Sequence, residues 1–167
     1  KGDGIGYYDG CNPKIMAMAM AYFLYVWQKH EELKRIEYAE KWFEYPLTKK
    51  HSLVGRNDAV TIDGIPVEHK TTSMDVDDEY VYSLQWDEQI LAYMGMTGTR
   101  EVYYTICRKP TIRQKKDESD SEFFNRMVQW YDVDTDRKIA VELISRTDDE
   151  VSEFMRGLEA TVDDMEN

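Results

Sequence analysis

The clearest signal in the chain is an alternation of polar and apolar residues over residues 53–72, where two runs rich in Val, Ile and Thr flank Asp63-Gly64. Gly accepts a positive φ without steric cost and Asp tolerates one, so this dipeptide predicts the turn of a β-hairpin. Because strand side chains alternate between two faces, Glu68 and Lys70 share one face and His69 lies on the other.

The length of the turn decides where Asp58, on the first strand, points. A two-residue turn at Asp63-Gly64 would place Asp58 opposite His69 and away from Glu68. A three-residue loop, or a bulge at the turn, would bring Asp58 onto the face of Glu68 and Lys70. The sequence leaves both registers open.

Periodicity and capping signals predict elements for most of the remaining chain. Asn12 followed by Pro13 is a helix start, and the apolar run from Ile15 to Trp27 predicts a buried helix that continues to Lys34. This run is too short for the roughly 20 residues that cross a bilayer, so we expect no membrane partner. The other expected elements are strands at 36–47, 100–108 and 137–146, helices at 83–96, at 121–131 and after Thr147, and loops at 1–11 and 73–82.

These elements predict an α/β (α+β) domain in which helices flank a mixed β-sheet. With 167 residues and 42% apolar content, the chain is long enough for one domain with its own core, so we expect residues 1–167 to form a single domain. The first residue is Lys1 rather than Met, a feature of fragments that lack an upstream segment.

The charge distribution excludes one class of nucleic-acid-binding protein. The net charge is −12, which argues against a surface that is basic throughout, although it leaves room for a local basic groove. Much of the acidity belongs to residues 147–167, which contain eight acids and one Arg. Two cysteines far apart suggest neither a disulfide framework nor a zinc site, and a reducing, cytoplasmic setting fits them.

The hairpin carries the candidate chemistry. The carboxylates of Asp58 and Glu68 could hold a hard divalent cation through oxygen, and the Lys70 ammonium could orient or deprotonate a water beside it. The alternative is a solvated strand face with a local salt bridge, since such residues are abundant at surfaces.

Three separated motifs point to a family. Gly55-x-x-Asp58, Glu68-His69-Lys70-Thr71 and Gln89-x-x-x-Tyr93 resemble, in order and spacing, the signature of the RecB-like, phage-type branch of the PD-(D/E)xK nuclease superfamily. The run 108–113 followed by Glu122-Phe123-Phe124 also resembles the segment after the core in phage-type members, so the resemblance covers residues 40–131. It departs upstream, where many relatives carry a Gly-x-x-x-His metal-ligand helix that this chain lacks, and His30 does not take that role.

The resemblance implies a restriction-endonuclease-like fold and Mg²⁺- or Mn²⁺-dependent hydrolysis of DNA phosphodiesters by an exonuclease of phage or bacterial recombination and repair. It implies metal binding by Asp58, Glu68 and the His69 backbone carbonyl. It further implies that Lys70 positions or activates the attacking water and that Gln89 and Tyr93 support the catalytic site.

A basic run follows the last motif. Five of the nine residues from Arg108 to Lys116 are basic, namely Arg108, Lys109, Arg113, Lys115 and Lys116. Clustered cations release condensed counterions when they meet a nucleic-acid backbone, so we expect this run to contact DNA phosphates. The alternative is a solvated loop.

Two other functions compete with an exonuclease. A degenerate relative could bind DNA or a partner protein without cutting, which the acidic charge and the missing upstream His favour and the complete Asp58, Glu68 and Lys70 set opposes. A structure-specific endonuclease is the third interpretation. The expected partners are DNA and either a second copy of the chain or a recombination partner protein.

Overall fold

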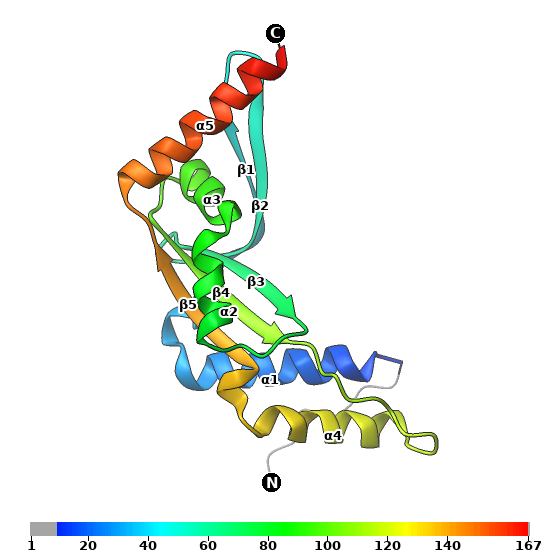
Figure 1. Ribbon diagram of the computed structural model, residues 1–167. Coiled ribbons are helices and arrows are strands. Elements are labelled where there is room, and N and C mark those ends of the chain that lie inside the picture. Colours follow the sequence, from blue (N-terminus) through cyan, green and yellow to red (C-terminus); the bar gives the residue numbers. More distant parts are fainter. Residues whose placement is uncertain (1–9, 167) are drawn as a thin grey trace. The chain divides into compact units, whose positions relative to one another are not determined.

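The computed structural model describes residues 10–166, so most of the loop expected at residues 1–11 lies outside the described part of the chain. The elements, shown in Figure 1, are α1 (Pro13–Lys29), a 3-10 helix (Glu31–Lys34), β1 (Ile36–Pro46), β2 (Ser52–Thr61), β3 (Pro66–Thr72), α2 (Asp78–Ser83), a 3-10 helix (Leu84–Trp86), α3 (Glu88–Thr97), β4 (Glu101–Arg108), α4 (Asp120–Asp132), a 3-10 helix (Thr135–Arg137), β5 (Ile139–Ser145) and α5 (Asp148–Glu166). This is the mixed α+β composition that the sequence predicts.

The described residues form two compact units. The helical unit consists of residues 10–34, 70–80 and 106–141, and the hairpin unit consists of residues 35–69, 81–105 and 142–166. Strands β3, β4 and β5 each contribute residues to both units. No helix in residues 10–166 combines the length and the apolar character that crossing a bilayer requires.

The five strands form one mixed sheet in the order β1-β2-β3-β4-β5. Strand β2 is antiparallel to both β1 and β3. Strands β3 and β4 are parallel, because Thr105 Oγ1 donates to the Glu68 carbonyl and Lys109 N–H donates to the Thr72 carbonyl, with the same offset along both strands. Strand β5 is antiparallel to β4, since Arg108 bonds to Lys138 near one end and Arg100 to Arg146 near the other.

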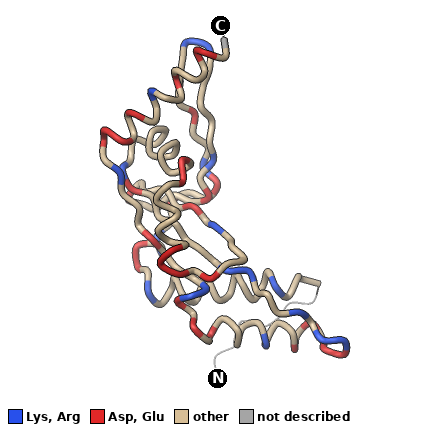
Figure 2. The backbone as a smooth tube through the Cα atoms, viewed as in Figure 1, with Lys and Arg blue, Asp and Glu red and all other residues tan. Residues whose placement is uncertain are grey.

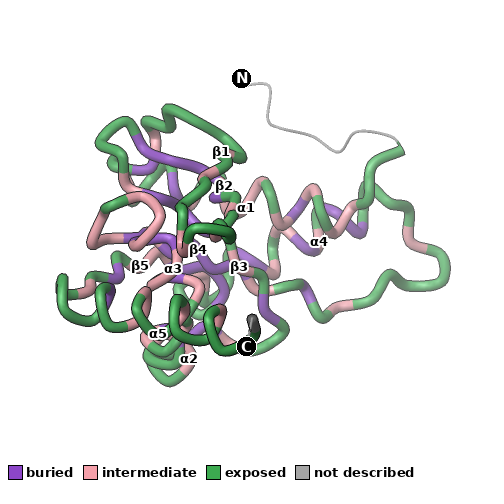
Figure 3. Tube along the Cα trace, turned by 90° about the horizontal axis from the view of Figure 1, so that it is seen from above, coloured by how far each residue is buried: buried purple, intermediate pink, exposed green. Residues whose placement is uncertain are grey.

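In the hairpin unit, α3 covers one face of the β1–β2 ribbon and α5 packs on α3 (Figure 1). Two glycines make these close approaches possible. A Cβ at Gly55 would collide with the Met96 side chain, and a Cβ at Gly95 would collide with the Met155 thioether. Among residues 10–166, no helix covers the opposite face of the ribbon, which we call its open face (Figure 1). Strand β1 is exposed at most positions, whereas the end of β2 is buried (Figure 3).

In the helical unit, α1 packs against α4 around a core of Ala17, Phe123, Phe124 and Met127. Expectation and structure differ on α1, because several of its apolar side chains, including Phe23 and Trp27, are exposed rather than buried. The helix also ends earlier than expected, at Lys29. His30 has φ −127° and ψ 83°, and the backbone resumes as a separate 3-10 helix.

The start of the middle helix is a second correction. The sequence suggested a helix capped by Ser83 after an acidic loop, but α2 and a 3-10 helix occupy residues 78–86. Asp87 is the N-cap of α3, where its side chain accepts a 2.9 Å hydrogen bond from Gln89 N–H. Two other expected boundaries are confirmed, since Gly98 ends α3 with φ 76° and Thr147 exchanges capping hydrogen bonds with Glu150.

Candidate active site

The turn of the β2–β3 hairpin is a three-residue loop. Thr61 N–H donates to the Ile65 carbonyl at 2.9 Å, and Gly64, at φ 83°, donates to the Thr61 carbonyl at 2.9 Å. A positive φ at this position favours Gly because it has no Cβ. The structure therefore selects the longer of the two turns that the sequence left open.

The register that follows from this loop brings two carboxylates together. The strands pair Ala59 with Val67 and Val60 with Pro66, so the next position sets Asp58 opposite Glu68. At this position a side chain links the two strands: the Asp58 Oδ2 on β2 accepts a 2.8 Å hydrogen bond from the His69 backbone N–H on β3. In a strand, the N–H and C=O of one residue point to the same side, so the His69 carbonyl lies on the Asp58 side of β3.

Helix α3 holds the second carboxylate. Glu68 is 7% exposed, and its Oε1 accepts a hydrogen bond from Gln89 Nε2 at 3.2 Å. The same Gln89 amide donates to the Tyr93 hydroxyl at 2.7 Å, and Tyr93 donates in turn to the Arg56 carbonyl at 3.1 Å. This chain of hydrogen bonds, which we call the Gln89–Tyr93 relay, ties the Glu68 carboxylate to the backbone of β2.

The electrostatics of the relay favour a protonated phenol. Burial raises the pKa of Tyr93, and the negative charge of Glu68 raises it further. The hydroxyl therefore keeps its proton at neutral pH and remains a donor to the Arg56 carbonyl. A stable donor at this point keeps the Gln89 amide in the orientation that serves Glu68.

Two contacts fix the surroundings of the relay. Tyr104 on β4 donates to Asp87 Oδ2 at 2.5 Å, and burial together with this bond raises the pKa of Tyr104. Because Asp87 also caps α3, the pair joins the first turn of that helix to the sheet. Gly55, the first residue of the motif, lies against the same helix, because an added Cβ would collide with the Met96 side chain and would lie 3.4 Å from Tyr93 Cε1.

His69 contacts the candidate site through its backbone N–H and forms a further hydrogen bond through its ring. Its Nδ1 is hydrogen-bonded to Thr105 Oγ1, and the same hydroxyl donates to the Glu68 carbonyl at 3.4 Å. Thr105 is buried on β4. Sequence reasoning did not find Thr105, although the predicted strand at 100–108 contains it, because its role depends on the parallel pairing of β3 with β4.

Five of the predicted site residues, Asp58, Glu68, His69, Gln89 and Tyr93, come together in the hairpin unit. Lys70 is the first residue of β3 that belongs to the helical unit. It is half-buried and lies two positions beyond Glu68 in the sequence.

The donor set bears on which metal could bind. Within residues 10–166, no group of three or more His, Cys, Asp or Glu side chains is arranged to hold a metal ion. Asp58, Glu68 and the His69 carbonyl instead offer oxygen alone. Mg²⁺ is commonly held by one or two carboxylates, with water and substrate phosphates completing its shell, so this set fits a hard divalent cation.

The predicted phosphate-binding run lies in the helical unit, between β4 and α4. Its first member, Arg108, is engaged internally through a bond to Asp75 and a position 5.6 Å from the centre of the Trp130 ring. The other four basic residues are exposed, and the positive charge gathers in the loop before α4 (Figure 2). These four are Lys109, Arg113, Lys115 and Lys116.

Glu118 fixes the backbone of this loop. Its carboxylate accepts from Lys115 N–H at 2.8 Å and from the Arg126 guanidinium at 2.7 Å, and Arg126 also donates to the Arg113 carbonyl. The bonds from Arg126 lower the pKa of Glu118 to about 2, so the carboxylate stays charged across the ordinary pH range. The cationic side chains are thus carried by an anchored backbone.

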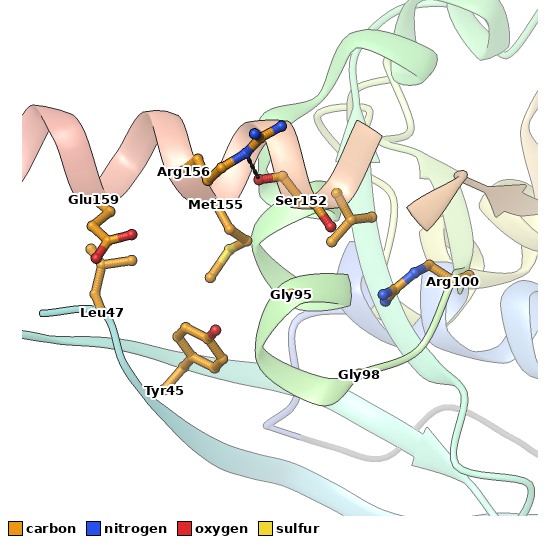
Figure 4. A pocket seen from close by; sticks show the side chains of 10 residues that line it. Tyr45, Leu47, Gly95, Gly98, Arg100, Ser152, Met155, Arg156 and Glu159 are labelled. Carbon is orange, nitrogen blue, oxygen red and sulfur yellow. Dashed lines mark hydrogen bonds between the residues drawn. The ribbon is translucent and has the colours of Figure 1, made fainter. Parts of the chain in front are cut away.

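A separate hollow of about 270 Å³ lies in the hairpin unit (Figure 4). It is lined by Tyr45, Leu47, Gly95, Gly98, Arg100, Val151, Ser152, Met155, Arg156 and Glu159. Arg100 donates to Asp148 at 2.5 Å, and Arg156 donates to the Ser152 carbonyl of its own helix at 3.3 Å. None of the predicted site residues lines this hollow.

Comparison with known proteins identifies the fold. No family model and no curated protein matches the sequence. The chain is similar to the crystal structure of a phage-related exonuclease from Haemophilus somnus 129PT, with a TM-score of 0.54, 15% identity, and coverage of 93% of this chain and 72% of that one. It is also similar to the structure of SSO0001, with a TM-score of 0.46, 18% identity, and coverage of 89% and 58%. The likeness to the phage-related exonuclease shows that the chain has a nuclease-like fold.

Proposed function

We propose that this chain is a divalent-metal-dependent deoxyribonuclease that acts as an exonuclease in phage or bacterial recombination and repair. The observation that carries the proposal is the register of the β2–β3 hairpin, which sets Asp58 beside Glu68. The fold that the chain shares with a phage-related exonuclease adds support. Function still depends on the residues of the site, because one fold hosts many activities.

In this proposal Asp58, Glu68 and the His69 carbonyl hold Mg²⁺ or Mn²⁺. The bound ion would polarise the phosphodiester and favour ionisation of a water at neutral pH. The protein contributes orientation. The His69 N–H fixes the Asp58 carboxylate, and the Gln89–Tyr93 relay fixes that of Glu68, so neither has to reorganise when charge develops.

Lys70 has a different role from the carboxylates, because it is a compact cation on the strand that carries Glu68. We assign it to positioning or deprotonating the attacking water. A lysine can lose its proton when its surroundings disfavour the charge, whereas an arginine guanidinium stays charged. Lys70→Arg should therefore fail to replace Lys70.

The test is release of nucleotides from end-labelled linear DNA with Mg²⁺ or Mn²⁺, run against a chelator control. The wild-type chain should degrade the DNA only with the metal. Lys70→Ala should abolish release while leaving Mn²⁺ binding nearly unchanged, because the ion is held by oxygen. Lys49→Ala, an equal change of charge at the exposed β1–β2 turn, is the matched control and should retain activity.

Covalently closed circular DNA separates the remaining interpretations. An exonuclease leaves the circle intact and degrades it after linearisation, whereas cutting of the closed circle would indicate an endonuclease. If the wild-type chain binds linear DNA but releases nothing with either metal, the non-catalytic binding module replaces the proposed function.

A further inference from the structure

The open face of the β1–β2 ribbon carries an exposed tryptophan next to the candidate active site. Trp42 on β1 is 66% exposed, and it pairs with Arg56 on β2 in the strand register. The Arg56 guanidinium carbon lies 5.5 Å from the centre of the Trp42 ring. This cation–π arrangement holds the two side chains against each other on the surface.

The pair is continuous with the carboxylate site. Arg56 and Asp58 are two residues apart on β2, which separates them by roughly 7 Å along the strand. The backbone carbonyl of Arg56 is also the end point of the Gln89–Tyr93 relay. A ligand that stacks on Trp42 would therefore contact the residue that pairs with it, Arg56, two positions before Asp58 on β2.

The composition of this face argues against a protein partner. Charged residues interrupt it, since Glu40 lies 3.6 Å from the Arg56 guanidinium and Glu44 follows Trp42 on the same face. Glutamate is depleted at protein interfaces, so the two glutamates make this patch a poor interface core although Trp and Arg are common there. A planar ring flanked by a guanidinium instead suits a nucleobase, because every base offers a π-face.

We propose that Trp42 and Arg56 form a stacking platform for a base of single-stranded DNA, and that the substrate strand enters the site unpaired. The proposal rests on the proposed function for the identity of the nucleic acid. A base inside a duplex is covered by its neighbours and cannot stack on Trp42, so the platform selects a single-stranded or frayed end. The platform contributes to DNA binding through contact between the rings and not through charge, because Glu40 offsets much of the Arg56 charge.

The experiment measures binding of a fluorescein-labelled oligo(dT) and of a blunt duplex of equal length by anisotropy, in chelator so that no cleavage occurs. Trp42→Ala should weaken single-strand binding about tenfold, in line with the removal of one stacked base, with no matching decrease on the duplex. Trp42→Phe keeps a ring and should retain most of the affinity. In both variants the slope of log affinity against log salt should equal that of the wild type, because no phosphate-binding cation is removed.

Trp27→Ala is the matched control, since Trp27 is 56% exposed and carries the Lys34 ammonium 4.9 Å from its ring centre. Equal decreases for Trp42→Ala and Trp27→Ala, equal decreases on single strand and duplex, or no change for Trp42→Ala would each overturn the platform. The proposed function fails separately. Trp42-dependent binding without cleavage by the wild type in Mn²⁺ would sustain the platform and reject the nuclease.

Discussion

The Asp58 carboxylate accepts a 2.8 Å hydrogen bond from the backbone N–H of His69, eleven residues further along the chain. The donor is a peptide group, so the orientation of this carboxylate depends on the register of the hairpin and not on a neighbouring side chain. A charge-assisted bond of this kind is stronger than a neutral one. It holds Asp58 opposite Glu68 before any ligand arrives.

Asp58 accepts this hydrogen bond and also carries a negative charge, and one substitution can test the two properties separately. Asp58→Asn keeps an oxygen that can accept from His69 N–H, so the variant should fold with little change in thermal stability. It removes one of two carboxylate charges, so Mn²⁺ binding measured by calorimetry should disappear together with cleavage. Asp63→Asn makes the same charge change in the exposed turn and should bind as the wild type does. Unchanged Mn²⁺ affinity in Asp58→Asn would remove this residue from the metal site.

The Gln89–Tyr93 relay predicts a stability effect in addition to reduced activity. Gln89→Ala takes the amide donor from Glu68 Oε1 in a buried position, which should cost about 1–3 kcal/mol in the free energy of unfolding measured with urea. The matched change Gln28→Ala, on the exposed surface of α1, should stay within about 0.5 kcal/mol. If the two variants were equally stable, the hydrogen bond to Glu68 would contribute nothing to folding.

The contact between Gly55 and α3 can be tested by a double-mutant cycle. Gly55→Ala places a Cβ where the Met96 side chain lies, and overpacking of this kind should destabilise the protein by about 1–3 kcal/mol. Shortening the neighbour in Gly55→Ala/Met96→Ala should relieve the clash, so the double variant should be more stable than the sum of the two single effects predicts. Additive effects would show that Gly55 serves backbone conformation and not the approach of α3.

The exposed cations before α4 predict the salt dependence of DNA binding. Replacing Arg113, Lys115 and Lys116 with Gln should weaken binding and flatten the slope of log affinity against log salt, by roughly one unit for each phosphate that the variant no longer neutralises. Arg108→Gln is a different change, since it breaks the internal bond to Asp75. An unchanged slope in the triple variant would make this segment a solvated loop.

The sequence predicts the hairpin, its motif residues and the mixed sheet, because alternation and turn chemistry are local properties. It does not predict the register, since both turn lengths satisfy the alternation and only the pairing of Thr61 with Ile65 decides between them. The difference matters because a shift of one residue moves Asp58 to the other face. The sequence thus proposed residues for the candidate site, without Thr105, but not their arrangement.

Other misses have physical causes of the same kind. Ser83 is a good capping residue by type, but the chain forms a 3-10 turn after it, and Asp87, which also bonds to Tyr104, caps α3 instead. Thr105 contacts His69 and Glu68 only because β4 lies parallel to β3, a non-local pairing without a local sequence signal. Tertiary context selected among local options that the sequence allowed.

The three-residue loop at Ile62-Asp63-Gly64 therefore has an evolutionary consequence. Surface loops usually tolerate the insertion or deletion of a residue, because the cost in closure entropy is small. Here a single-codon deletion that removes Asp63 would leave the core, the motifs and every other residue in place, yet it would turn Asp58 away from Glu68. Lineages that keep the fold and the motifs but carry such a deletion would retain the scaffold without its paired carboxylates, so turn length would mark inactive relatives that motif searches score as intact.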